Sequence, residues 1–207
     1  YSKETQQKEH AFYRIGLISA KIGDCKKSKR FFELLIKNFP NSKYIEEANF
    51  RLLRCPNYFY SEYKNLVYGD SETHGNNAKE EITYTYKDFK KMKFISKIYS
   101  GKKLFTKRKG EIIFKDHEVI EKIDGKEKPI FVYNKEDLVA KNNIKFKVEE
   151  INEVNIKAGR FYNCIKVIFE EGEINMASYY APEIGRVLTS SIYQNNEKRI
   201  MELISYE

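Results

Sequence analysis

The chain has 207 residues, of which 41% are hydrophobic and 14% aromatic, and its formal net charge at pH 7 is +8. This apolar content is sufficient for a folded core and excludes a wholly disordered chain. Since no run of about 18 apolar residues occurs, the sequence contains no candidate for a membrane-spanning helix.

Residues 1–68 show the apolar periodicity of α-helices. A first helix is indicated by four apolar residues at helical spacing, Ala11, Ile15, Ile18 and Ile22. A second helix is expected over residues 28–39 and is closed by Pro40, which cannot continue a helix. Gly16 of the first helix would allow the two helices to pack closely in an antiparallel hairpin, because it lacks a side chain.

A third helix begins after Ser42, a good N-cap residue, and ends before Pro56. Apolar residues within 59–67 could form a short fourth helix. Residues 69–79 are polar and contain two glycines, so they are interpreted as the linker between a helical segment, 1–68, and a second domain, 80–207.

Beyond the linker the apolar period changes from 3.6 to 2, which is typical of half-buried strands. The strands are expected at 81–86, 91–98, 111–120, 129–133, 144–154, 161–169, 174–180, 187–193 and 200–206. Gly110 and Gly159 are among the residues interpreted as turns. The predicted fold class is therefore α+β, with helical hairpins followed by an antiparallel sheet curved into a half-barrel or meander.

The helical segment resembles the tetratricopeptide repeats of bacterial envelope proteins, such as outer-membrane assembly lipoproteins. Phe12-x2-Ile15-Gly16, Ser28-x3-Phe32 and Pro40 fit the spacing of that repeat. The segment Phe39-Pro40-Asn41-Ser42-Lys43-Tyr44 matches the junction between such repeats. The resemblance implies a surface that binds another protein, with further repeats expected upstream of Tyr1.

A second resemblance lies between residues 158 and 187. Ala158-Gly159-Arg160-Phe161 and Tyr179-Tyr180-Ala181-Pro182-Glu183-Ile184-Gly185-Arg186-Val187 are similar to the closing strands of an uncharacterised envelope β-domain family, Ala-Gly-x-Phe…Tyr-Tyr-Ala-x-x-x-Gly-x-Val. Together the two resemblances imply an extracytoplasmic bacterial protein, in the cell envelope or periplasm. A lipid anchor upstream of Tyr1 is expected to go with this location.

Three cysteines are too few for a fold built on disulfides, and their spacing fits no metal site. Cys25 follows the first predicted helix and Cys55 ends the third, so stacked helices could bring them together as a disulfide in an oxidising compartment. The other interpretation is that both are small buried side chains.

No catalytic, cofactor-binding or metal-binding residues are predicted, and we expect no enzymatic activity. His117 lies between Asp116 and Glu118, but on a strand its side chain points to the opposite face, so exposed strand residues are the favoured interpretation. Cys164 lies within an apolar strand and is interpreted as packing rather than as a nucleophile.

A concentration of positive charge lies in residues 87–109, which contain ten Lys or Arg side chains and one acidic residue, Asp88. Five lysines of two predicted strands are candidates for binding an anion: Lys91, Lys93, Lys97, Lys103 and Lys107. Nucleic acid, lipopolysaccharide or an anionic lipid surface would be suitable partners. The competing interpretation is a solvated outer face of a one-sided sheet.

The sequence therefore predicts a non-enzymatic extracytoplasmic scaffold or binding protein. Its helices would bind a protein partner, and its sheet would act as a platform or hold an apolar ligand. The alternative is a polyanion or membrane-surface binder that acts through residues 87–109.

Overall fold

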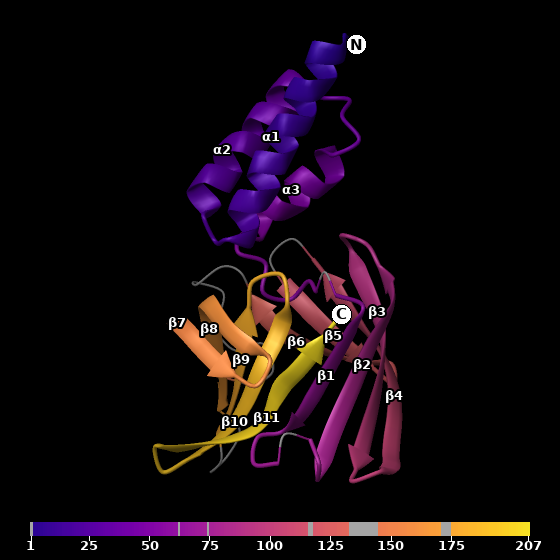
Figure 1. Ribbon diagram of the computed structural model, residues 1–207, viewed down its shortest axis with the longest axis vertical. Coiled ribbons are helices and arrows are strands. Elements are labelled where there is room, and N and C mark those ends of the chain that lie inside the picture. The colour runs from indigo at the N-terminus through magenta and orange to yellow at the C-terminus, as the bar shows by residue number, and fades with distance from the viewer. Residues whose placement is uncertain (1, 62, 74, 116–117, 133–144, 171–174) are drawn as a thin grey trace. The chain divides into compact units, whose positions relative to one another are not determined.

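The computed structural model describes residues 2–61, 63–73, 75–115, 118–132, 145–170 and 175–207 (Figure 1). The chain forms two compact units, Tyr1–Asn57 and Tyr58–Glu207, which are taken separately below. The first unit is helical, and the second is a single antiparallel sheet.

The helical unit contains α1 (Lys3–Lys21), α2 (Cys25–Asn38) and α3 (Ile45–Leu53). Two polar N-caps begin the long helices: Ser2 accepts a hydrogen bond from the Thr5 backbone, and Asp24 accepts one from Lys27. The core is formed by Phe32, Leu35, Phe39 and Ala48, against which Phe12, Tyr13, Leu17, Ile36, Tyr44 and Leu52 pack.

Gly16 allows α1 and α2 to approach closely, as the sequence predicted. A Cβ atom at this position would lie 2.8 Å from Cδ1 of the fully buried Phe32 ring. The predicted apolar face of α1 is nevertheless wrong in part, because Ile18 and Ile22 are exposed, while Ser19 and Ala20 are buried.

A disulfide joins Cys25, the first residue of α2, to Cys55, two residues beyond the end of α3. The two Cα atoms are 5.5 Å apart, within the normal range for a disulfide. The bond closes a loop that contains α2 and α3, and so restricts the unfolded helical unit.

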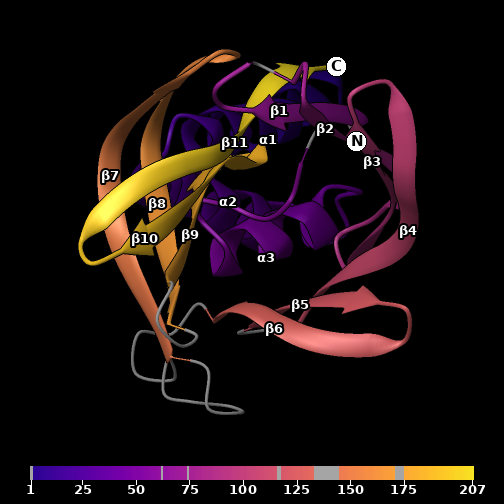
Figure 2. The same ribbon diagram turned by 90° about the horizontal axis from the view of Figure 1, so that it is seen from below.

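The sheet unit contains eleven strands in the described part of the chain, ordered β6-β5-β4-β3-β2-β1-β11-β10-β9-β8-β7. Their bounds are β1 (Asn65–Asp70), β2 (Ala78–Lys87), β3 (Lys91–Ser100), β4 (Lys103–Phe114), β5 (Glu118–Ile123), β6 (Lys126–Val132), β7 (Lys145–Ile156), β8 (Gly159–Glu170), β9 (Asn175–Ala181), β10 (Gly185–Tyr193) and β11 (Asn196–Tyr206). Strands consecutive in sequence are neighbours, except β6 and β7, which lie at the two edges of the sheet, and the C-terminal strand β11 also pairs with β1. Figure 2 shows the sheet curling so that its two arms face each other.

The inner face of the sheet carries most of its buried side chains. In β3, buried Met92, Phe94 and Ser96 alternate with the more exposed Lys91 and Lys93. This alternation is the period-2 signal of a sheet with one solvated face. The largest fully buried side chains of the unit are Tyr68, Leu66, Met92, Leu203, Val119, Val167 and Val187.

The predicted fold class was wrong. The described residues contain three helices: α1 and α2 form one hairpin, and α3 is short. They do not form an array of tetratricopeptide-like hairpins joined to a sheet. The predicted fourth helix is also absent from this part of the chain, because Leu66 and Val67 belong to β1. Pairing of β1 with both β2 and β11 outweighs the weak helical spacing of these residues.

The antiparallel strands were predicted correctly as a type, although some boundaries differ. The expected strand 111–120 covers the end of β4 and the start of β5, and between them the Lys115 amide donates to the Glu118 carbonyl oxygen. Gly110 is not a turn residue. It lies within β4 opposite Phe94, whose ring occupies the place of a side chain at this position.

The predicted linker 69–79 covers the end of β1, a turn and the start of β2, and the two compact units divide at residues 57 and 58 instead. Asp70 organises this turn by accepting hydrogen bonds from the backbone amides of Thr73, Asn77 and Ala78. Slight burial opposes ionisation of Asp70, but these bonds hold its pKa well below the usual range.

We expect Gly16→Ala to destabilise the helical unit by about 1–2 kcal/mol, because the clash with Phe32 exceeds the gain in helix propensity. Far-UV circular dichroism during thermal unfolding measures this change. Gln7→Ala, at an exposed position of the same helix, is the control and should change stability by less than about 0.5 kcal/mol. Equal stability of the two variants would contradict the close contact.

Candidate ligand-binding cavity

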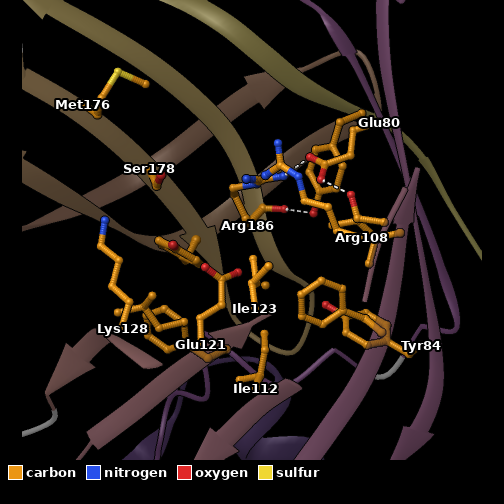
Figure 3. Close-up of a pocket in the computed structure, with 18 of the residues that line it drawn as sticks. Glu80, Tyr84, Arg108, Ile112, Glu121, Ile123, Lys128, Met176, Ser178 and Arg186 are labelled. Carbon is orange, nitrogen blue, oxygen red and sulfur yellow. Dashed lines mark hydrogen bonds and ion pairs between the residues drawn. The ribbon is translucent and has the colours of Figure 1, made fainter. Parts of the chain in front are cut away.

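The inner face of the sheet unit forms a partly open cavity of about 330 Å³ (Figure 3). Side chains from both arms of the sheet line it. The apolar ones are Phe59, Ile82, Phe94, Ile112, Ile123, Ile130, Phe169 and Met176. The polar and charged ones are Tyr68, Glu80, Tyr84, Ser96, Arg108, Glu121, Lys128, Ser178, Tyr180 and Arg186.

An ion pair between Arg186 of β10 and Glu80 of β2 crosses one end of the cavity. Nη2 of Arg186 lies 2.6 Å from Oε2 of Glu80, and the two side chains are 31% and 19% exposed. The hydroxyl of Ser96 donates to the other oxygen of Glu80 at 2.7 Å. This pair joins strands that are not neighbours, since β1 and β11 lie between them.

Tyr68 contacts Arg186 through both its ring and its hydroxyl group. Its ring centre lies 4.6 Å from the guanidinium carbon of Arg186, and its hydroxyl donates to the Arg186 carbonyl oxygen at 2.8 Å. A guanidinium over an aromatic ring is stabilised by the negative face of the ring. Both the side chain and the backbone of Arg186 are therefore held in place.

The charges of this pair stabilise each other despite partial burial. Burial opposes the ionised form of Glu80, but the charge of Arg186 and the hydrogen bond from Ser96 outweigh it and lower the Glu80 pKa. Burial likewise opposes the charge of Arg186, whose pKa is raised by Glu80. Both groups are ionised at neutral pH, and their charges cancel.

Glu121 of β5 is in a different situation. Burial raises the pKa of its carboxyl above the usual range, and the charges of Arg186, Lys128 and Arg108 only partly oppose this rise. Within the described residues, Glu121 forms no ion pair as short as that of Glu80. Of the two carboxylates among the described residues that line the cavity, Glu80 forms an ion pair with Arg186 and Glu121 does not.

Two further cations line the cavity, Arg108 of β4 and Lys128 of β6. Neither forms an ion pair within the part of the chain that the structure describes. Nζ of Lys128 lies 5.4 Å from the centre of the Phe169 ring, and Arg108 lies on the inward side of β4, opposite Ser96. The cavity thus combines apolar walls with cations that are available to a ligand.

The five lysines selected from the sequence do not line this cavity. Lys93 pairs with Glu111 across the β3–β4 ladder, with Nζ and Oε1 3.6 Å apart. Lys97 lies opposite both Lys107 and Glu81. The structure therefore places acidic residues among these lysines, which lie on β3 and β4: Lys91, Lys93, Lys97, Lys103 and Lys107.

Sequence reasoning missed the charged cavity residues, although a signal for them exists. Glu80 shares the inward side of β2 with Ile82 and Tyr84, and Arg108 shares that of β4 with Ile112. A charged residue at an inward position of an alternating strand is unusual, because burial of a charge is unfavourable unless it is paired. Such positions mark candidates for a site.

Of the other residues that the sequence raised as alternatives, Cys164 lies in the described part of the chain. Cys164 is buried and its thiol lies 3.4 Å from the Phe161 carbonyl oxygen. Burial raises the pKa of this thiol to about 11, so it is protonated at neutral pH. Asp116 and His117 lie outside the described residues.

Among the residues that the structure describes, no group of three or more His, Cys, Asp or Glu side chains is placed to hold a metal ion. In the same part of the chain, no helix is both long and apolar enough to cross a membrane.

No family model matches the chain, and no curated protein matches it. Solved structures do show similarity. A candidate lipoprotein from Parabacteroides distasonis is 14% identical, with a TM-score of 0.50, and the match covers 72% of this chain and 98% of that one. A candidate exported protein from Bacteroides fragilis with a YMCC-like fold is 12% identical, with a TM-score of 0.48 and the same coverage.

At this identity the similarity concerns the fold alone. The predicted family, a tetratricopeptide-repeat protein fused to an envelope β-domain, was wrong. Of the two motifs that suggested the β-domain, residues 158–161 form the end of a turn and the start of β8, and residues 179–187 form the end of β9, the turn at 182–184 and the start of β10, where Gly185 has a φ of +96°. This turn brings Arg186 onto the inner face.

We expect Arg186→Met to destabilise the sheet unit by about 2 kcal/mol at neutral pH, because Glu80 would remain charged and partly buried without its partner. Adding Glu80→Gln should recover part of this loss, which a double-mutant cycle in urea would measure. In Arg186→Met, Glu80 keeps the burial that raises a carboxyl pKa and loses the charge that lowers it, so the deficit should shrink as the pH falls and Glu80 takes up a proton.

The matched control is Lys93→Met, which breaks the exposed pair with Glu111. The two side chains of this pair are 48% and 31% exposed, so the loss should be below about 1 kcal/mol. If both variants lost the same stability, the cavity pair would have no special role.

Proposed function

We propose that the chain is a non-enzymatic binding protein of the bacterial envelope, and that its sheet unit holds a small, partly apolar ligand in the cavity. The observation that carries this proposal is the cavity of about 330 Å³ on the inner face, with apolar side chains from both arms of the sheet. Its volume lies at the lower end of the range of ligand sites, about 300–1,000 Å³.

The location outside the cytoplasm is supported by two observations. The disulfide between Cys25 and Cys55 is of a kind that persists in oxidising compartments. The solved structures that share the fold come from a candidate lipoprotein and a candidate exported protein.

A binding role rather than catalysis is supported by the state of the reactive groups. The Cys164 thiol is buried and protonated at neutral pH. Glu80 and Arg186 are engaged with each other and with Ser96 and Tyr68. These groups hold the shape of the cavity, and a nucleophile paired with a base is not among the contacts of the described residues that line it.

N-phenyl-1-naphthylamine, a neutral probe that fluoresces in apolar sites, tests the proposal. We expect saturable fluorescence enhancement with the folded protein and loss of most of it in Met176→Trp, because the larger ring would fill the cavity. The control is Tyr162→Trp, which adds the same indole at an exposed position of β8. Absence of saturable binding, or equal binding to both variants, would refute a ligand-holding cavity.

A second candidate function is attachment to an anionic surface through the β3–β4 hairpin. Its tip exposes Phe105 (77%) and Leu104 (47%) beside Lys103, and Lys107 follows on β4. Apolar side chains flanked by lysines suit the boundary of a membrane that contains anionic lipids.

Replacement of the five lysines by Ser should then abolish sedimentation with phosphatidylglycerol vesicles and salt-dependent retention on heparin. These lysines are Lys91, Lys93, Lys97, Lys103 and Lys107. A variant with Lys26, Lys27 and Lys29 of α2 changed to Ser is the control for general loss of charge. Unchanged retention of the five-lysine variant would eliminate this candidate.

A further inference from the structure

The cavity of the sheet unit carries more positive than negative charge. We propose, building on the function proposed above, that its ligand is an amphipathic anion, whose charged group contacts Arg108 and Lys128 and whose apolar part packs on Ile112, Ile123 and Met176. Nothing in the comparisons assigns a ligand to this fold.

The charge balance follows from the pairing within the cavity. Arg186 is neutralised by Glu80, with 2.6 Å between Nη2 and Oε2. Of the other charged side chains that line the cavity, two are positive, Arg108 and Lys128, and one is negative, Glu121. Arg108 and Lys128 are exposed residues, and the excess of positive charge that they add to a cavity with apolar walls attracts an anion and repels a cation.

The positions of these side chains are set by the strand register. Glu121 of β5 lies opposite Lys128 of β6 on one side and Ile112 of β4 on the other. Arg108 is four residues before Ile112 on β4, so it shares the inward side of that strand. Figure 3 shows Lys128, Glu121 and Arg186 directed toward the same space, with Ile112 and Ile123 beside them.

The two free cations favour a carboxylate or a phosphate over a neutral polar group. Hydrogen bonds to ionised acceptors are about twice as strong as those between neutral groups, and the fork of Arg108 can donate two of them at once. A purely apolar ligand would make no contact that uses the charges of Arg108 and Lys128.

Glu121 makes the affinity depend on pH. The charged groups that face it are Arg186, Lys128, Arg108 and Glu80. Since its pKa is raised, Glu121 takes up a proton at a pH where Glu80 stays ionised, and the cavity then loses its unpaired negative charge. Binding of an anion should therefore strengthen as the pH falls from neutral to mildly acidic values.

The experiment measures displacement of N-phenyl-1-naphthylamine by four amphiphiles with the same alkyl chain: laurate, lauryl phosphate, dodecanol and dodecyltrimethylammonium. We expect at least one of the two anions to displace the probe at a concentration about tenfold lower than the ammonium compound. The tighter of the two identifies the head group as a carboxylate or a phosphate.

Variants assign the contacts. Arg108→Gln and Lys128→Gln should each weaken binding of the preferred anion about tenfold and leave binding of the neutral probe unchanged. Glu121→Gln should strengthen anion binding at neutral pH and remove its pH dependence. The control is Lys109→Gln, which removes the same charge from the neighbouring position of β4, where the side chain does not line the cavity.

The outcomes separate this inference from the function on which it rests. If the probe binds but the four head groups compete equally, or Lys109→Gln matches Arg108→Gln, the cavity holds a ligand without selecting anions, and the inference is overturned. If the folded protein binds no probe at all, the proposed function fails as well.

Discussion

The contact between Arg186 and Glu80 is the constraint on which the inner face of the sheet depends. The two residues belong to β10 and β2, which are separated by β1 and β11. In a flat sheet, strands three places apart are about 14 Å from each other, so an ion pair of 2.6 Å needs long side chains and a curled sheet. Tyr68 of β1 and Ser96 of β3, the two strands that flank β2, donate hydrogen bonds to the Arg186 carbonyl and to the Glu80 carboxylate. The curl in turn forms the partly open cavity.

The polar lining of this cavity is poorly explained by stability alone. A buried ion pair contributes little to folding compared with apolar residues of the same volume. Glu121 carries a raised pKa because burial disfavours its charge, and Arg108 and Lys128 face the same space. Glu121 is partly buried, and a fold selected only to pack its core would place an aliphatic side chain there, as it does at Ile82 and Ile123, whereas Arg108 and Lys128 are exposed to solvent. A ligand that meets these charges explains them better.

The helical unit shows how a repeat pattern can arise from general packing rules. Gly16 opposite Phe32 allows two antiparallel helices to approach, and Pro40 ends the second helix. Any tight helical hairpin needs these features, whether or not further hairpins follow. In this chain the third helix ends at Leu53, and the disulfide between Cys25 and Cys55 closes the unit. The apolar residues after Pro56 that resembled another helix lead into β1 instead.

The sequence by itself determined the local features: the helices that end at Gly23 and Pro40, and the alternation that makes residues such as Met92 and Phe94 face inward. These depend on neighbours within a few positions along the chain. Only the tertiary structure decided which inward charges meet. Glu80 and Arg186 are 106 residues apart and come together because β11 pairs with β1, a contact between two ends of the sheet unit. Local spacing carries no information about that closure, so the cavity and its charges could not be read from the pattern of single strands.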